Sequence, residues 1–146
     1  LGLYLLHKKT TLNTLPGDPE NPLILAPGPL GGIPQFPGTS KCMAIALSPL
    51  TKTAFFGADP NWGRIIAAAG DAGVPLNPSK VDITLQGEMI AKGGAEIPFS
   101  EKKMKKLMSR KEISVTVDLN DGTASFDIYT TDLTYDYVKI NASYRS

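Results

Sequence analysis

The segment of residues 113–129 restricts the fold of this chain more than any other part of the sequence. Apolar and polar residues alternate on both sides of Asp121 and Gly122, a pair that is typical of two-residue β-hairpin turns. Alternation puts the apolar side chains of both strands on one face, and that face must be buried by packing against another layer of the structure. The segment therefore predicts an antiparallel hairpin with one buried side. The expected cross-strand pairs are Leu119 with Ala124, Val117 with Phe126, and Val115 with Ile128.

Other local signals predict helices that would supply this cover. The Asp-Pro pair at residues 59–60 is typical of a helix start, as N-cap and first helical residue. Ser100 is the expected cap of a second helix, and the apolar spacing after Asp132 favours a terminal helix over a strand. Residues 81–85 alternate as a half-buried strand that turns back at residues 87–88. The expected fold class is α+β, a two-layer sandwich of helices on an antiparallel sheet.

The first part of the chain has a different character, because eight of the twelve prolines lie within residues 1–49. Proline fixes φ and removes a backbone donor, so this stretch cannot be a continuous helix or a central strand. We expect short elements among loops, a helix at residues 3–9 and strands at 23–26 and 42–47. This Pro- and Gly-rich, irregular extension is expected to pack poorly on the rest of the chain.

Composition argues against several classes of function. A chain of 146 residues fits one ordinary domain, or one domain with a poorly packed extension. A formal net charge of +1 predicts no binding to nucleic acid or to a membrane surface, and no apolar run approaches the roughly 20 residues of a membrane helix. The one cysteine, Cys42, cannot form an intramolecular disulfide, fits a reducing cytoplasm, and is expected to be a small packed residue. The one histidine, His7, has no nearby cysteine, so no metal site is expected.

The string FGADPNWGRIIAAAG has a functional and a structural interpretation. The free N–H groups of a helix N-terminus, with Arg64 in the first turn, could hold a carboxylate. Alternatively, Asp59 and Asn61 cap the helix, Trp62 packs, and Arg64 pairs with an acid. The pattern favours the structural interpretation and leaves the other open.

Charged and polar residues elsewhere also favour structural roles. The basic residues within 102–111 lie on the outer side of an amphipathic helix without interleaved aromatic residues, which predicts a solvated face rather than a nucleic-acid site. Asp127, Asp132 and Asp136 match no standard metal spacing, and we interpret them as a strand residue, a cap and a helix-surface residue. A docked terminal helix and a polar pocket both explain the polar chain end. The side chains that would line such a pocket are Tyr135, Asn141, Tyr144 and Arg145.

Three strings carry a family resemblance: AFFGADPNWGRIIAAAGDAGV, KVDITLQG and ISVTVDLNDGTASFDIYTTDLTYDYVKINASYRS. Together they resemble the C-terminal part of ornithine acetyltransferase (bifunctional glutamate N-acetyltransferase) of arginine biosynthesis, over about residues 53–146. The resemblance implies a self-cleaving enzyme whose new N-terminal threonine takes acetyl from N-acetylornithine and passes it to glutamate. In the family that threonine lies far upstream of the DPNWGR string. Its context is not found in this sequence, so we expect no catalytic residue here.

The resemblance assigns two residues to the substrate. The family's substrate-contacting asparagine falls on Asn141, and its final threonine falls on Ser146, which keeps the hydroxyl but not the methyl group. The implied partners are an amino-acid substrate, ornithine or glutamate, and the remainder of the transferase chains. The resemblance implies no cofactor, no metal, no nucleic acid, no membrane, and a cytoplasmic location.

The first residues resemble a different family. LGLYLLHKK, DPENPLILAPGPLGG and PGTSKCMAIALSPLTKT are similar to the N-terminal domain of aldehyde ferredoxin oxidoreductases, which bind a tungsten or molybdenum pterin. We therefore expect a chimera with an oxidoreductase-like part at 1–52 and a transferase part at 53–146, joined at about residues 48–54. The alternatives are an oxidoreductase fragment and a fusion without function.

Overall fold

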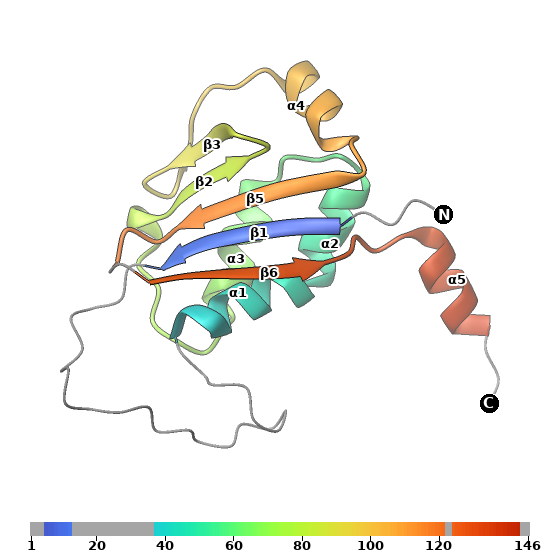
Figure 1. Ribbon diagram of the computed structural model, residues 1–146, viewed down its shortest axis with the longest axis horizontal. Coiled ribbons are helices and arrows are strands. Elements are labelled where there is room, and N and C mark those ends of the chain that lie inside the picture. The colour runs from blue at the N-terminus through green and yellow to red at the C-terminus, as the bar shows by residue number, and fades with distance from the viewer. Residues whose placement is uncertain (1–4, 13–36, 122–123, 144–146) are drawn as a thin grey trace.

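The computed structural model describes residues 5–12, 37–121 and 124–143 (Figure 1). Within these ranges no helix has the length and apolar composition that crossing a membrane requires. In chain order the elements are β1 (Leu5–Leu12), α1 (Pro37–Leu47), α2 (Pro49–Phe56), α3 (Trp62–Gly70), the 3-10 helix η1 (Pro78–Lys80), β2 (Asp82–Leu85), β3 (Glu88–Lys92), β4 (Ala95–Glu96), α4 (Glu101–Met108), β5 (Glu112–Asp118), β6 (Ala124–Thr130) and α5 (Tyr135–Ser143).

The described strands form one six-stranded sheet in the order β4-β3-β2-β5-β1-β6. Neighbouring strands are antiparallel except β1 and β5, which run parallel. Helices α1, α2 and α3 lie on one face of the sheet (Figure 1), and α4 closes one end of the same core by burying Met104 and Met108. The predicted fold class, α+β with helices layered on an antiparallel sheet, is confirmed, and the parallel pairing of β1 with β5 was not predicted.

The core lies between the sheet and these helices. In β5, Ile113, Val115 and Val117 are buried whereas Ser114 is exposed, so the predicted alternation is confirmed. The predicted strand at 81–85 is confirmed as β2, and its odd-numbered residues are fully buried. The polar side chains between them face away from the helices, which explains why one layer of helices is enough to cover this sheet.

Local capping and turn signals determine several element ends. Ser100 caps α4 as predicted, since its Oγ accepts a hydrogen bond from the Lys103 N–H at 3.3 Å. The lysines of α4 are exposed, which confirms the predicted solvated face. A two-residue turn joins β2 to β3, one residue earlier than predicted. Gln86 and Gly87 both have positive φ, 53° and 81°, as hairpin turns of type I′ require.

The pairing predicted for the hairpin at 113–129 is wrong, because β5 and β6 are not neighbours in the described sheet. Strand β1 lies between them, with Leu5 opposite Glu112 of β5 and Leu12 opposite Ala124 of β6. Two strand spacings, about 10 Å, separate β5 from β6, and the five-residue connection between them is long enough at about 3.3 Å per residue. Alternation specifies which face of a strand is buried, but it does not specify the neighbouring strand.

Two further corrections concern the first 50 residues. Residues 5–12 form β1 where the sequence predicts a helix at 3–9, and pairing on both sides uses the backbone donors and acceptors of this strand. Helix α1 replaces the strand predicted at 42–47. Its residues Cys42, Ile45 and Ala46 are buried at the i, i+3, i+4 spacing of a helix face. The prediction of poor packing is therefore wrong for α1 and β1, and the strand predicted at 23–26 lies outside the described residues.

Candidate functional site

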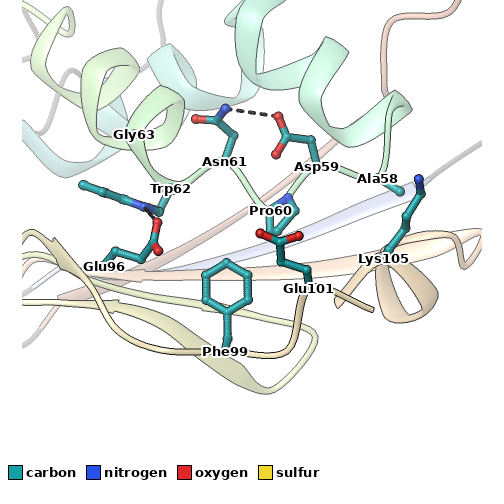
Figure 2. A pocket seen from close by; sticks show the side chains of 10 residues that line it. All are labelled: Ala58, Asp59, Pro60, Asn61, Trp62, Gly63, Glu96, Phe99, Glu101 and Lys105. Atoms are coloured by element: carbon teal, nitrogen blue, oxygen red, sulfur yellow. Dashed lines mark hydrogen bonds between the residues drawn. The ribbon is translucent and has the colours of Figure 1, made fainter. Parts of the chain in front are cut away.

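A hollow of about 470 Å³ opens where the loop between α2 and α3 faces the segment that joins β4 to α4 (Figure 2). One wall is the DPNWG string at residues 59–63, and the other comes from residues 96–105. Phe99 and Glu101 extend from the second wall toward Pro60 (Figure 2). The full lining is Ala58, Asp59, Pro60, Asn61, Trp62, Gly63, Glu96, Phe99, Glu101 and Lys105.

The first wall is shaped by a helix cap. Asn61, rather than the predicted Asp59, is the N-cap of α3, and its Oδ1 accepts a hydrogen bond from the Arg64 N–H at 3.0 Å. The Asn61 Nδ2 donates to Oδ2 of Asp59 at 3.1 Å, so Asp59 orients the cap (Figure 2). Helix α3 begins at Trp62, two residues later than the pattern predicts, because Asp59 and Pro60 belong to the loop. This loop shape leaves Asp59 at the rim of the hollow.

A long-range hydrogen bond joins the two walls. The indole N–H of Trp62 donates to Oε2 of Glu96 at 2.8 Å, across 34 positions of the sequence (Figure 2). The Trp62 ring is partly buried and packs against the hydrophobic core. A hydrogen bond to an ionised acceptor is shorter and stronger than one between neutral groups. The contact therefore fixes the rotamers of both side chains and the width of the hollow.

The charge of the hollow is negative. Asp59, Glu96 and Glu101 contribute three carboxylates and Lys105 one ammonium, which gives a formal charge of −2 for these lining residues. Trp62 and Phe99 add two aromatic side chains, whose ring faces attract cations. The chemistry of the lining therefore suits a positively charged group rather than a carboxylate.

Arg64 does not line the hollow. Its Nη1 donates to the Leu50 carbonyl oxygen at 3.0 Å and to the Thr53 Oγ1 at 3.3 Å, so the guanidinium joins α3 to α2. The hydroxyl of Thr51 supports this joint by donating to the Arg64 carbonyl oxygen at 3.4 Å. The predicted ion pair of Arg64 with an acid is not formed among the described residues, and the interpretation of Arg64 as a carboxylate ligand stays a prediction. The guanidinium satisfies backbone and hydroxyl oxygens of a neighbouring helix instead.

A second hollow, of about 540 Å³, has a structural explanation. It lies at the end of β2 beside Arg110 and Lys111. The Gln86 side chain uses both of its polar groups there: Nε2 donates to the Glu112 carbonyl oxygen at 2.8 Å, and Oε1 accepts from the Ser114 N–H at 3.2 Å. Gln86 thus ties the β2–β3 turn to β5. The Gln86 side chain therefore has a structural role at this hollow.

The aspartates near the chain end are separate from one another. Within the described ranges no three residues of the types His, Cys, Asp and Glu gather closely enough to hold a metal ion. Asp127 and Asp136 are exposed, as predicted, whereas Asp132 is buried. Burial raises the pKa of Asp132, against the opposing effects of its own backbone N–H and of Lys52. Asp132 is not the cap of α5, because the Thr134 Oγ1 accepts from the Tyr137 N–H at 3.1 Å.

Residues 38–146 match the ArgJ family. The chain belongs to this family. An arginine biosynthesis bifunctional protein ArgJ of Psychrobacter arcticus is 53% identical over 105 residues, which are 70% of this chain and 26% of the relative. The ArgJ protein of Pseudomonas syringae pv. tomato is 50% identical over 105 residues, with the same shares of both chains. The chain thus spans about a quarter of the length of these curated ArgJ relatives.

A solved structure supports the same family. The crystal structure of the arginine biosynthesis bifunctional protein ArgJ of Bacillus halodurans superposes with a TM-score of 0.74 at 30% identity, over 96% of this chain and 57% of that chain. The resemblance to ornithine acetyltransferase is therefore confirmed at the level of the family. The ArgJ match begins at residue 38 and runs through residues 48–54, where the sequence analysis puts the junction with an oxidoreductase-like part. Helix α2 also runs through this junction, and the comparisons give the chimera no support.

Asn141, one of the two residues assigned to the substrate, does not line the hollow. Asn141 is exposed on α5, where its Nδ2 donates to the Tyr137 carbonyl oxygen at 2.8 Å. Ser146 lies outside the described residues. Sequence reasoning missed the second wall of the hollow, Glu96, Phe99 and Lys105, because nothing in the local pattern links these residues to the DPNWG string. The Trp62 indole, a donor that needs an acceptor when partly buried, is the one signal that pointed to a distant carboxylate.

Proposed function

We propose that this chain is the C-terminal part of a glutamate N-acetyltransferase of arginine biosynthesis, which transfers acetyl from N-acetylornithine to glutamate together with the remainder of the transferase chains. The observation that carries the proposal is the ArgJ match over residues 38–146. The proposal includes a cytoplasmic setting, in keeping with the single Cys42, which is fully buried.

The reaction is an acyl transfer through a covalent intermediate. In the proposed enzyme the threonine hydroxyl attacks the acetyl carbonyl of N-acetylornithine, ornithine leaves as the free amine, and the glutamate amine then takes the acetyl group from the threonine. The nucleophile is assigned to the part of the transferase upstream of the matched residues. The role proposed for the matched residues is to hold the amino-acid substrate.

Asn141 and Ser146 are the proposed substrate-binding residues. The Asn141 Nδ2 uses one of its two N–H donors on the Tyr137 carbonyl oxygen, so its second N–H can donate to a carboxylate and the Oδ1 can accept from an ammonium group. The Ser146 hydroxyl can donate to a carboxylate or accept from an ammonium. An amide and a hydroxyl on one short segment therefore suit the two charged ends of an amino acid.

The origin of the first residues is a separate proposal. Residues 1–37 lie outside the ArgJ family match, but the ArgJ crystal structure superposes over 96% of the chain. Descent of the first residues from a different parent, such as the N-terminal domain of an aldehyde ferredoxin oxidoreductase, therefore rests on the sequence resemblance alone. Genomic reads across residues 30–56 test this proposal. Reads that interrupt the frame there support a join between two parents, and uninterrupted reads from independent isolates remove it.

A segment exchange tests the proposed function. The segment of the Psychrobacter arcticus relative that matches this chain is replaced by residues 38–146, and acetyl transfer from N-acetylornithine to glutamate is measured. We expect activity close to that of the relative. Asn141→Ala should raise the KM for one or both amino acids about tenfold or more, since a hydrogen bond to a charged group contributes about 1.5–3 kcal/mol.

Lys139→Ala is the matched control, because Lys139 is exposed on the same helix. It should leave both KM values unchanged. A well-folded exchange protein without activity contradicts the proposed function. An active exchange protein whose KM values do not respond to Asn141→Ala removes Asn141 from the substrate site and leaves the rest of the proposal intact.

A further inference from the structure

The hollow at the DPNWG loop carries negative charge that its described neighbours do not neutralise. Asp59, Glu96 and Glu101 line it, and Lys105 contributes the one ammonium group among the described lining residues. None of the three carboxylates forms an ion pair with another described residue. The whole chain has a formal net charge of +1, so the hollow is a local site of negative potential on a nearly neutral protein.

The carboxylates of the hollow are oriented and still able to accept hydrogen bonds. An ionised carboxylate has about four acceptor positions on its two oxygens. One position of Asp59 is used by the Asn61 side chain, and one position of Glu96 is used by the Trp62 indole. These bonds fix the directions of the two carboxylates. They leave the other oxygens for donors that come from outside.

Two aromatic side chains line the hollow, one from each wall. Trp62 belongs to the first wall and Phe99 to the second (Figure 2), and both are partly buried against the hydrophobic core. Core packing and the hydrogen bond from Trp62 to Glu96 hold the rings in place. A ring face attracts a cation within about 6 Å of its centroid. The hollow therefore offers ring faces for a flat cation beside acceptors for its N–H groups.

The size and spread of the lining favour an organic cation over a metal ion. Within the described ranges no three acidic, histidine or cysteine side chains gather closely enough to hold a metal ion, so the carboxylates surround the hollow without converging on one point. The volume of about 470 Å³ lies in the range of small-molecule pockets, about 300–1,000 Å³. A guanidinium group is planar, stacks on aromatic rings and has five N–H donors in a fixed fork. It matches spread acceptors and ring faces better than an ammonium group with three donors.

We propose that the hollow at the DPNWG loop binds a guanidinium group, which stacks on the Phe99 ring and donates to the carboxylates of Glu96 and Glu101. Phe99 comes between these two acids along the second wall, so its ring and their acceptors belong to one short segment. The inference is independent of the proposed function, because Asn141 does not line the hollow. A free guanidinium compound and the arginine side chain of a partner protein present the same group.

Titration of the whole chain with methylguanidinium chloride tests the proposal. Trp62 is the one tryptophan and lines the hollow, so its emission responds directly to a bound ligand. Sodium chloride at equal ionic strength is the reference. We expect a saturable change in emission with a Kd of about 1–10 mM, because exposed ion pairs and cation–π contacts each contribute little.

A second probe distinguishes the two sources of the group. N-acetyl-arginine amide presents the guanidinium as a peptide does. A Kd below that of methylguanidinium assigns the ligand to a partner protein, and an equal or higher Kd assigns it to a free compound.

Two substitutions locate the binding. Glu101→Gln removes one lining charge and should raise the Kd about two- to fivefold. Glu112→Gln is the matched control, because Glu112 is also exposed and does not line this hollow, and it should leave the Kd unchanged. Phe99→Leu keeps an apolar side chain but removes the ring face, and it should raise the Kd by a similar factor of about two to five.

A titration without a saturable change in emission, or one that sodium chloride reproduces, overturns the proposal. Equal Kd values for Glu101→Gln and Glu112→Gln also overturn it, because net charge then explains the binding. Circular dichroism checks that each variant is folded. If Phe99→Leu unfolds, Glu101→Gln decides alone, since Glu101 is exposed in the first turn of α4.

Discussion

Replacing Gly94 with alanine should destabilise the protein by disturbing the second wall of the hollow. Gly94 has a φ of +74°, and a Cβ built there would lie 2.2 Å from the Pro78 carbonyl oxygen and 2.8 Å from its carbon. The left-handed conformation alone costs a residue with a Cβ about 1–2 kcal/mol. Relief of the clash needs a backbone shift of about 0.8 Å to reach 3.0 Å, which adds about 1–3 kcal/mol. The expected loss is therefore about 2–5 kcal/mol.

Gly87→Ala is the matched control for backbone strain. Gly87 has a φ of +81°, and a Cβ there would meet nothing within 4 Å, so only the cost of about 1–2 kcal/mol for the conformation applies. Thermal unfolding followed by circular dichroism measures both variants, at about 2–4 °C per kcal/mol for a chain of about 150 residues. The Tm loss of Gly94→Ala should be at least about twice that of Gly87→Ala.

The fluorescence of Trp62, the one tryptophan of the chain, provides a local readout. Glu96 follows Gly94 by two residues, and its carboxylate accepts the Trp62 indole N–H at 2.8 Å. A backbone shift at Gly94 should lengthen this hydrogen bond and move the emission of Trp62, whereas Gly87→Ala should leave the emission unchanged. Equal Tm losses with identical emission spectra would refute the close packing of Gly94 on Pro78 and its role in holding Glu96.

Two other expectations concern the first wall and the α5 junction. Asn61→Ala removes the cap of α3 and should lower the free energy of unfolding by about 0.5–2 kcal/mol. Asp59→Ala keeps the cap and should lower it less. Urea unfolding at equal slope measures both variants, and a larger loss for Asp59→Ala contradicts the assignment of the cap. Burial raises the pKa of Asp132 above its ordinary 3.8, so the folded state binds the proton more tightly than the unfolded chain. The Asp132 contribution to stability therefore rises as the pH falls from above the folded pKa toward 3.8. Asp132→Asn should remove this contribution. The Tm values of wild type and variant are measured from about pH 7 to about pH 4, and their difference should change with pH. A constant difference argues against a raised pKa of Asp132.

Local chemistry explains the elements that the sequence predicts correctly. The Ser100 cap of α4 and the alternation in β2 and β5 depend on neighbours within a few residues, so the pattern contains the whole signal. The missed helix α1 also had a local signal, the spacing of Cys42, Ile45 and Ala46. The prolines around it favoured extended and irregular structure instead. The proline in question, Pro37, is the first residue of the helix, a position that tolerates it.

The candidate site was predictable on one side only. The DPNWG string marked its first wall, but Glu96 reaches Trp62 across 34 residues, and no periodicity extends that far. The role of Arg64 was equally hidden, because its partners are an ordinary backbone carbonyl and a hydroxyl on α2. Side-chain types indicate which bonds a residue can make. Only the fold decides which partners come within reach.

The position of β1 between β5 and β6 implies a competition during folding. The Asp121–Gly122 pair and the alternation around it favour a local hairpin, and such hairpins form within about 1–10 μs. The folded sheet contains no such pairing among its described strands. If the hairpin forms first, β5 and β6 must separate before β1, from the other end of the chain, can pair between them. Pairing of β1 with β5 closes a loop of more than 100 residues, because Leu5 lies opposite Glu112, and this closure costs chain entropy. A local hairpin formed early by this segment would therefore be a non-native pairing, and we expect its opening to slow the approach to the native state.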